Sequence, residues 1–174
     1  MIVDKNGAIN IENLGIVITP EFTLGDLLNN PNSKNFPFRG SNSGFHRYGI
    51  RGGEIDGSPF GALLIFYNGL IAQIFISYSG FKSKIPRERT KEQEILTKKK
   101  HDEIMIEQHG ATEIKYKWGD IGSFMGREGD AQIAITYNNF PIKGRASKIP
   151  VKSPSPSPLG NDPSAWHRVK CMPF

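Results

Sequence analysis

The sequence has little cysteine and no recognisable cofactor motif. Cys171 is the single thiol among 174 residues, which excludes an internal disulfide framework and a cysteine zinc site and fits a reducing cytoplasm. No HExxH pair, glycine-rich phosphate loop or GxSxG motif occurs, so the sequence has no pattern for a metal, nucleotide or serine-hydrolase site. We therefore expect a cytoplasmic protein that needs no cofactor.

An unbroken membrane span is also missing. Residues 60–80, FGALLIFYNGLIAQIFISYSG, are the least polar stretch, but Asn68-Gly69 divides them. Asn-Gly is the strongest short hairpin signal, because both central positions of a type I′ turn need a positive φ. The flanking Ile, Phe and Tyr favour strands, so we predict strands at 61–67 and 70–77 and no membrane hairpin. The N-terminal MIVDKNGAIN lacks a basic region followed by an apolar run, which argues against a secretory signal.

The two-residue turn also predicts the register of this hairpin. Both of its faces are mostly apolar, whereas a hairpin with one face in water alternates apolar and polar residues. We therefore expect it in the middle of a sheet, covered on both sides by a helix, the chain's own tail or a partner subunit. The expected cross-strand pairs are Tyr67 with Leu70, Ile65 with Ala72, and Leu63 with Ile74.

The positive charge is unevenly distributed along the chain. Residues 1–141 contain 16 Lys and Arg and 16 Asp and Glu, so they are neutral. Residues 142–174 contain six Lys and Arg against Asp162 alone, and six minus one gives the whole net charge of +5. The basic character therefore belongs to the C-terminal segment, and nucleic-acid binding stays open but is not favoured.

Alternation and turn signals predict an α+β fold. We expect a mainly antiparallel sheet of about six to eight strands, one long helix packed on it and a short N-terminal helix. The long helix is predicted over 86–109, with Thr90 and Gln93 as an alternative capping box and Gly110 as its end. The other predicted elements are one or two strands in 8–18, a short helix capped by Thr23 and Asp26, a polar loop over 31–44, strands at 45–50 and 53–56 joined at Gly52-Gly53, a half-buried strand in 112–118, and a hairpin that turns at 127–130.

The last part of the chain is predicted to be a tail rather than part of the domain. We place a single α+β domain at 1–142 and a basic, Ser/Pro-rich tail at 143–174, because KSPSPSPLG favours a stiff, extended spacer. The tail ends in spaced apolar residues, so we expect it to dock by its end, either on its own domain or on a second copy in a homodimer. The candidate partner-binding residues are Lys98, Lys99 and Lys100 on the long helix and Trp166, Arg168 and Lys170 in the tail.

One cluster has side chains that catalysis could use. FHRYGIRGGEID brings His46, Tyr48, Arg51 and Glu54 close together in the sequence, and a metal-independent nuclease needs an acid, a base and a cation for the phosphate. On a strand, His46 and Tyr48 would share one face and Arg47 would lie on the other. This spacing is ordinary for a strand, so structural roles are favoured over catalysis.

The second half of the chain resembles a known group of bacterial proteins. The pattern is NGLIAQIFISYSG, then a charged helix, then KWGDIGSFMGREGDAQIAITY, with Asn68-Gly69, Trp118-Gly119, Gly129 and the final Ile-x-Ile-x-Tyr as its main positions. It is similar to small immunity proteins of contact-dependent and polymorphic toxin systems. The resemblance covers residues 60–138 and implies a binding protein that blocks a cognate toxin, without assigning a role to any single residue.

Three functions follow from these observations. The first is a non-catalytic protein-binding module of immunity or antitoxin type, whose partner is a cognate protein toxin. The second is a small metal-independent nuclease or toxin domain that uses the cluster at 45–54. The third is a structural or assembly subunit. The sequence leans toward a protein that is not an enzyme.

Overall fold

A seven-stranded antiparallel sheet forms the body of the protein. The structure is a computed structural model that describes residues 2–55, 58–78, 90–126 and 129–140. The strand order is β3-β4-β5-β6-β9-β8-β7, which confirms the predicted α+β class with a mainly antiparallel sheet. The strands are β3 (Phe38–Asn42), β4 (Phe45–Ile55), β5 (Ser58–Tyr67), β6 (Leu70–Tyr78), β7 (Glu113–Tyr116), β8 (Gly119–Met125) and β9 (Ala131–Tyr137).

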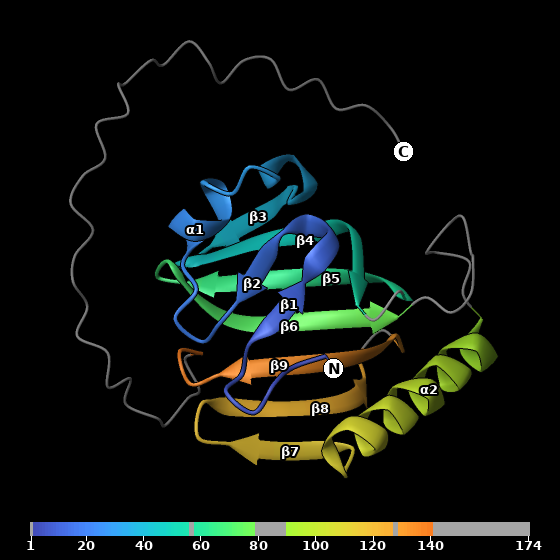
Figure 1. Ribbon diagram of the computed structural model, residues 1–174. Helices are drawn as coiled ribbons and strands as arrows, with labels where there is room; N and C mark the ends of the chain where they lie inside the picture. The colour runs from blue at the N-terminus through green and yellow to red at the C-terminus, as the bar shows by residue number, and fades with distance from the viewer. Residues whose placement is uncertain (1, 56–57, 79–89, 127–128, 141–174) are drawn as a thin grey trace, which may run out of the picture.

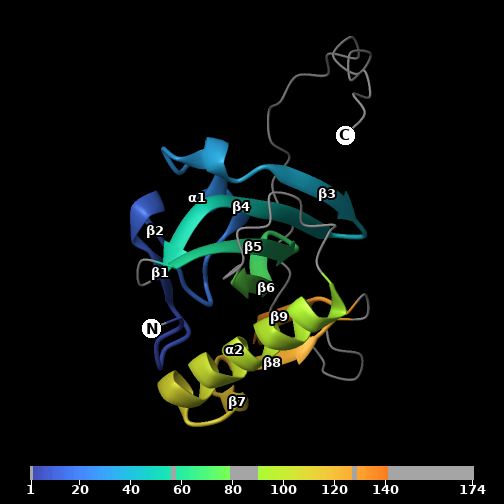
Figure 2. The ribbon, with the colours of Figure 1, turned by 90° about the vertical axis from the view of Figure 1, so that its right-hand side faces the viewer.

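Smaller elements surround this sheet. A separate two-stranded sheet, β1 (Ile9–Ile11) with β2 (Ile16–Ile18), lies in front of the strands β4 to β6, and the helix α2 (Lys91–His109) runs along one end of β7 to β9 (Figures 1 and 2). The remaining elements are η1 (Glu12–Leu14), α1 (Leu24–Leu28) and η2 (Ser33–Asn35). No helix among the described residues is long and apolar enough to cross a membrane.

The central hairpin is confirmed, but its register is not the predicted one. Asn68 and Gly69 both have positive φ, 49° and 84°, as a type I′ turn requires. Tyr67 pairs with Leu70 as expected, yet Ile65 pairs with Gln73 and not with Ala72. An extra residue on β6 forms a bulge between the pairs at Ile65 and Phe66. The predicted pairing of Leu63 with Ile74 is therefore also wrong, and Leu63 lies opposite Phe75.

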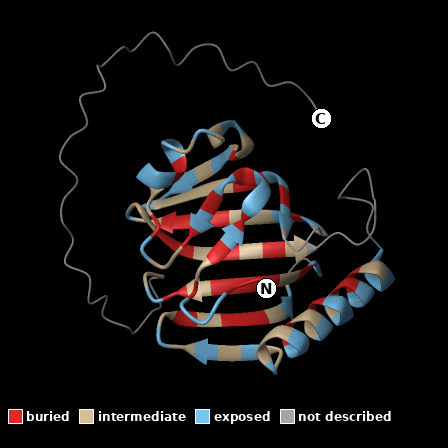
Figure 3. Cartoon of the chain, in the orientation of Figure 1, coloured by how far each residue is buried: buried red, intermediate tan, exposed pale blue. Residues whose placement is uncertain are grey.

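The two faces of the hairpin are buried to different degrees. Leu64 pairs with Ile74, which pairs in turn with Ile135, and all three are at most 1% exposed. They belong to the core cluster, which also contains the four isoleucines of β1 and β2. On the opposite face, Leu63 and Phe75 are only half-buried. The sequence predicted cover on both faces, whereas in the described part of the chain the face of Leu64 and Ile74 is more deeply buried than the other (Figure 3).

Residues 45–55 form one strand, which corrects the prediction of two. The register of β4 against β5 shifts between Ile50 and Gly53, so the extra residue makes a bulge and not a turn. Gly52 in this bulge has φ 69°, a conformation that glycine adopts easily. A Cβ on Gly53 would come within 2.7 Å of the Phe60 ring, so these glycines allow the strand to bend over a bulky neighbour.

The predicted polar loop at 31–44 contains more structure than expected. It includes η2 and the edge strand β3, which pairs with β4. Phe36 is buried, whereas Phe38 is 56% exposed. The sequence did not predict β3, because its Asn, Ser and Gly residues have low strand propensity and the strand forms through pairing with the neighbouring β4.

Both helices begin at the predicted capping boxes. In α1, the Thr23 side chain accepts a bond from the Asp26 N–H and the Asp26 side chain accepts one from the Thr23 N–H. Thr90 and Gln93 make the same reciprocal pair at the start of α2. The helix therefore begins at Lys91 and not at residue 86, and Gly110 ends it with φ 83°. Residues 79–89 lie outside the described residues.

The buried side of α2 is largely polar. Its buried residues are Glu94, Thr97, His101 and Met105, which follow a helical spacing of three to four. Of the apolar residues of the helix, only Met105 is fully buried, and Ile104 is half-buried. The remaining three are more than half exposed: Ile95, Leu96 and Ile106.

Candidate functional site

The residues of the predicted catalytic cluster do not converge on one site. His46 and Tyr48 pair with Phe66 and Leu64 of β5, so both lie on the same face of β4, as the alternation predicted. Arg51 lies beyond them in the β-bulge and is exposed, and Glu54 is also exposed. The bulge interrupts the regular alternation between the two pairs of residues, so sequence proximity overstated how closely they are grouped.

Tyr48 has a structural environment. Its ring packs edge-on against Phe66 at 6.1 Å between centroids and against Phe38 at 5.4 Å. Burial raises the pKa of the Tyr48 phenol above its usual value, so the phenol stays protonated near neutral pH and is not available to accept a proton. Edge-to-face aromatic packing of this kind stabilises the sheet, and it gives Tyr48 a role without catalysis.

Of the lysines proposed as a partner contact, Lys99 and Lys100 are exposed on α2, whereas Lys98 is half-buried. Lys98 is 2.6 Å from the Asp102 carboxylate, and Lys99 is 4.0 Å from Glu103. Pairs four positions apart on a solvated helix contribute little stability. Lys100 is exposed, so these residues remain a prediction for binding. Trp166, Arg168 and Lys170, together with the proposed boundary between residues 142 and 143, lie outside the described residues.

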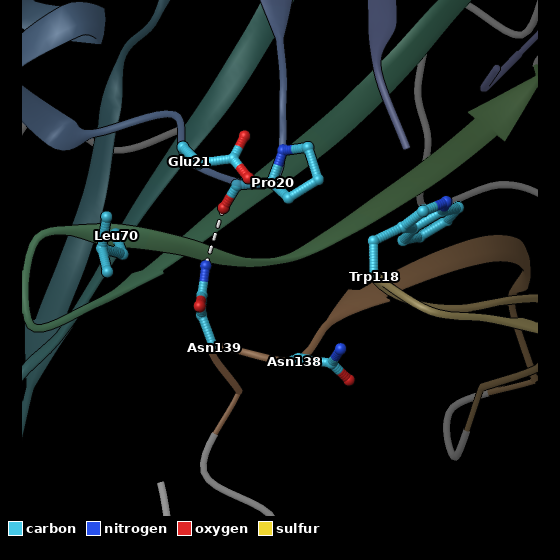
Figure 4. A pocket seen from close by; sticks show the side chains of 6 residues that line it. All are labelled: Pro20, Glu21, Leu70, Trp118, Asn138 and Asn139. Atoms are coloured by element: carbon cyan, nitrogen blue, oxygen red, sulfur yellow. Dashed lines mark hydrogen bonds between the residues drawn. The ribbon is translucent and has the colours of Figure 1, made fainter. Parts of the chain in front are cut away.

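A pocket at the other end of the sheet gathers residues from four separate segments (Figure 4). It has a volume of about 350 Å³, which is near the lower end of the range for small-molecule sites. Two residues come from the turn before α1, one from the start of β6, one from the turn between β7 and β8, and two from the end of β9. The lining residues are Pro20, Glu21, Leu70, Trp118, Asn138 and Asn139.

Backbone hydrogen bonds hold the upper wall of this pocket in place. Phe22 N–H donates to the Thr19 carbonyl at 3.0 Å, which closes the turn that carries Glu21. Ile71 N–H donates to the Phe22 carbonyl at 2.9 Å. The Asn139 side chain donates to the Pro20 carbonyl at 2.7 Å and to the Ile71 carbonyl at 3.2 Å. One amide therefore ties the turn before α1 to β6 and to the end of β9.

Trp118 forms the facing wall and is fixed on several sides. Its indole stacks on Tyr116 at 5.1 Å with an interplanar angle of 9°, and its Nε1–H donates to the Lys5 carbonyl at 3.1 Å. A Cβ on Gly7 would come within 2.6 Å of the indole, so the backbone of the N-terminal segment lies directly against the ring. The indole is therefore held in one position before any ligand arrives.

The pocket is rich in hydrogen-bond acceptors. The amide NH₂ of Asn138 donates to the Lys117 carbonyl at 2.6 Å, and the amide NH₂ of Asn139 makes the two bonds described above. Because backbone carbonyls only accept, these bonds fix the orientation of both amides and leave their side-chain oxygens as acceptors. The Glu21 carboxylate is exposed and has no ion-pair partner among the described residues.

Tyr137, next to the pocket, is affected by the acidic groups at this end of the sheet. Tyr137 is 1% exposed, and its hydroxyl donates to the Gly7 carbonyl at 2.9 Å. Burial raises the pKa of Tyr137, and the nearby Asp4 and Glu21 carboxylates raise it further. Both acidic groups therefore contribute negative potential to this end of the sheet.

Sequence reasoning missed this pocket. Trp118 was recognised as the end of a half-buried strand, but the other residues had no motif, because they come together only when four turns meet. No group of three or more His, Cys, Asp or Glu side chains within the described ranges could hold a metal ion. The arrangement suits binding of a side chain or small group more than it suits acid–base chemistry.

Comparisons with known proteins give one informative result. No protein-family model matches the chain, and no curated protein matches it. Its fold is similar to that of a chain in the solved structure of Rhs1-CT in complex with cognate immunity protein RhsI1. The TM-score is 0.50 at 13% sequence identity, and the alignment covers 79% of this chain and 88% of that chain. At this identity the likeness shows a shared fold.

Proposed function

We propose that this protein is the immunity component of a bacterial toxin–immunity pair of the Rhs type, and that it neutralises a cognate toxin by binding it. The observation that carries the proposal is the fold, which is similar to that of a chain in a toxin–immunity complex over most of both chains. The resemblance of residues 60–138 to immunity proteins supports the same assignment.

The complex contains a toxin and an immunity protein, so the alternative function to test is that this chain is the toxin. The described residues favour binding over catalysis. Tyr48 packs between aromatic rings, the bulge separates Arg51 and Glu54 from His46, and His109 is bonded to the Tyr116 hydroxyl at 3.1 Å. The chemically capable side chains are spread over the sheet, whereas the preformed pocket contains a single ionisable group, Glu21.

Co-expression with the product of the neighbouring gene tests the proposal. An immunity protein should co-purify with that product and restore growth to cells that produce it, while its own expression leaves growth unchanged. His46→Ala should leave the protection unaltered. Growth arrest by this chain alone, relieved by the neighbouring product and abolished in His46→Ala, would instead identify the chain as the toxin and overturn the proposal.

A further inference from the structure

We propose that the pocket of Pro20, Glu21, Leu70, Trp118, Asn138 and Asn139 binds an arginine side chain presented by the partner protein. The inference rests on the proposed function for the identity of the partner. The chemistry of the occupant comes from the pocket itself, as the following three observations show.

The first observation is the imbalance between donors and acceptors. The Trp118 indole N–H is bonded to a backbone carbonyl, the Asn139 amide NH₂ makes two such bonds, and the Asn138 amide NH₂ makes one. The acceptors that remain on the lining are the Glu21 carboxylate and the two amide oxygens. A ligand that offers several N–H donors satisfies them, whereas an anion would meet these oxygen atoms and could accept a side-chain bond only from the second N–H of Asn138.

The second observation is charge. Glu21 is the single ionisable residue of the lining, and it has no ion-pair partner among the described residues. Asp4, whose carboxylate accepts bonds from the N–H groups of Asn6 and Ala8, adds a second negative group at this end of the sheet. The site is therefore complementary to a cation, and a cation that carries its own N–H donors fits both this and the first observation.

The third observation is the apolar part of the lining. Leu70, Pro20 and the Trp118 indole offer surface to an aliphatic stem, and Figure 4 shows Trp118 facing Glu21 and Pro20 across the pocket. Tyr116 stacks on the indole and Gly7 lies against the ring, so Trp118 serves as an apolar wall and not as a stacking platform. A planar guanidinium forms paired bonds with a carboxylate, which an ammonium does not. The volume of about 350 Å³ accommodates one side chain. These features favour arginine over lysine.

The pocket can be tested with the full-length protein and a pair of peptides. The probe is Ac-Gly-Arg-Gly-NH₂, and its control is the same peptide with citrulline, which keeps the shape of arginine but removes the charge. The readout is the ¹⁵N–¹H resonance of the Trp118 indole, assigned by its loss in Trp118→Phe. We expect saturable shifts with the arginine peptide in the millimolar range and binding about tenfold weaker with citrulline.

Variants of the protein complete the test. Glu21→Gln keeps the size of the exposed side chain and should weaken binding of the arginine peptide about tenfold. Glu107→Gln is the matched control, because Glu107 is also exposed but lies on α2, away from the pocket lining, and it should bind like the wild type. Equal binding of the arginine and citrulline peptides, or the absence of a saturable shift, would overturn the assignment.

The same variants separate this inference from the proposed function. If the neighbouring-gene product binds the wild type, Glu21→Gln should weaken that complex about tenfold, and Glu107→Gln should not. A complex that forms with unchanged affinity in Glu21→Gln would overturn the pocket as the partner's site while the immunity function stands. If the wild type binds no such product, the immunity function fails, and the peptide titration still decides whether the pocket recognises arginine.

Discussion

The central hairpin β5–β6 and the helix α2 join the same core through different kinds of side chain. The hairpin buries apolar residues, among them Leu64 and Ile74 at 0% and 1% exposure. The helix buries Glu94, Thr97 and His101 together with Met105, while the side chains of Ile95, Leu96 and Ile106 are more than half exposed. The Glu94 carboxylate accepts a bond from the Ala131 N–H at 2.7 Å, so a polar contact fastens the helix to the start of β9.

This difference shows that the two elements are positioned by different forces. Burial of apolar area is non-directional and scales with the area removed from water, so the hairpin needs only a hydrophobic pattern and a turn. A buried polar side chain is stable only when it is hydrogen-bonded, so α2 depends on particular partners. The hairpin should therefore respond to any loss of apolar character, and the helix to a few specific substitutions.

The largest expected effect is that of a charge in the hairpin core. Leu64→Asp places an unpaired carboxylate at a position with 0% exposure, at a cost of several kcal/mol against a typical total stability of about 5–15 kcal/mol. We expect no soluble, folded protein. Leu63→Asp is the control, because Leu63 is half-buried on the opposite face, and it should fold with a lower melting temperature. A Leu64→Asp protein that melts like the wild type would show that this face is not the core.

A smaller effect is expected for two neighbouring residues on α2. Met105 is fully buried and Ile106 is 53% exposed. Met105→Ala should lower the free energy of unfolding by about 2–4 kcal/mol, whereas Ile106→Ala should change it by less than about 0.5 kcal/mol. Urea unfolding of the two variants measures both values. A similar loss of unfolding free energy in both variants would contradict the structure, in which Met105 faces the core and Ile106 faces solvent.

The smallest effect concerns the end of α2 and depends on pH. Burial lowers the pKa of His109 below the usual histidine value of about 6.5, so between the two pKa values the unfolded chain binds this proton more readily than the folded one. The stability that neutral His109 contributes is therefore complete above pH 6.5 and is lost as the pH falls through the folded pKa. His109→Gln should flatten the fall in melting temperature between pH 7 and pH 5. An identical pH profile in the variant would show that another group causes that fall.

Local signals in the sequence predicted the local structure well. The Asn68-Gly69 turn, both capping boxes and the end of α2 at Gly110 each depend on a few adjacent residues, and all were confirmed. The bulge in β6 was not predicted, because nothing in the sequence of the strand marks which residue is left unpaired. The glycines at 52 and 53 signalled an irregular backbone correctly, but the sequence could not distinguish a bulge from a turn.

Properties that depend on distant contacts were predicted poorly. The burial of Glu94 on α2 was not predicted, because its partner, the N–H of Ala131, lies on a distant strand that the sequence does not reveal. The pocket was missed for the same reason, since Glu21 and Asn139 are brought together by a bond between segments that are far apart. In the candidate cluster at 45–54, the prediction that His46 and Tyr48 share one face of the strand was confirmed. The positions of Arg51 and Glu54 were not predicted, because the sequence did not reveal the bulge between Ile50 and Gly53.

The hydrogen bond from Tyr137 to Gly7 has a consequence for biosynthesis, because it joins residues 130 positions apart. At about 5–20 residues per second, a ribosome needs roughly 7 to 26 s to synthesise the chain between them. The capping box of α1 spans three positions and can form within a fraction of that time. Residues 5–7 emerge first but must wait for Trp118 and Tyr137 before they can pack. A nascent chain that ends before Asn139 therefore lacks a complete pocket, because its last lining residue follows the final strand of the sheet.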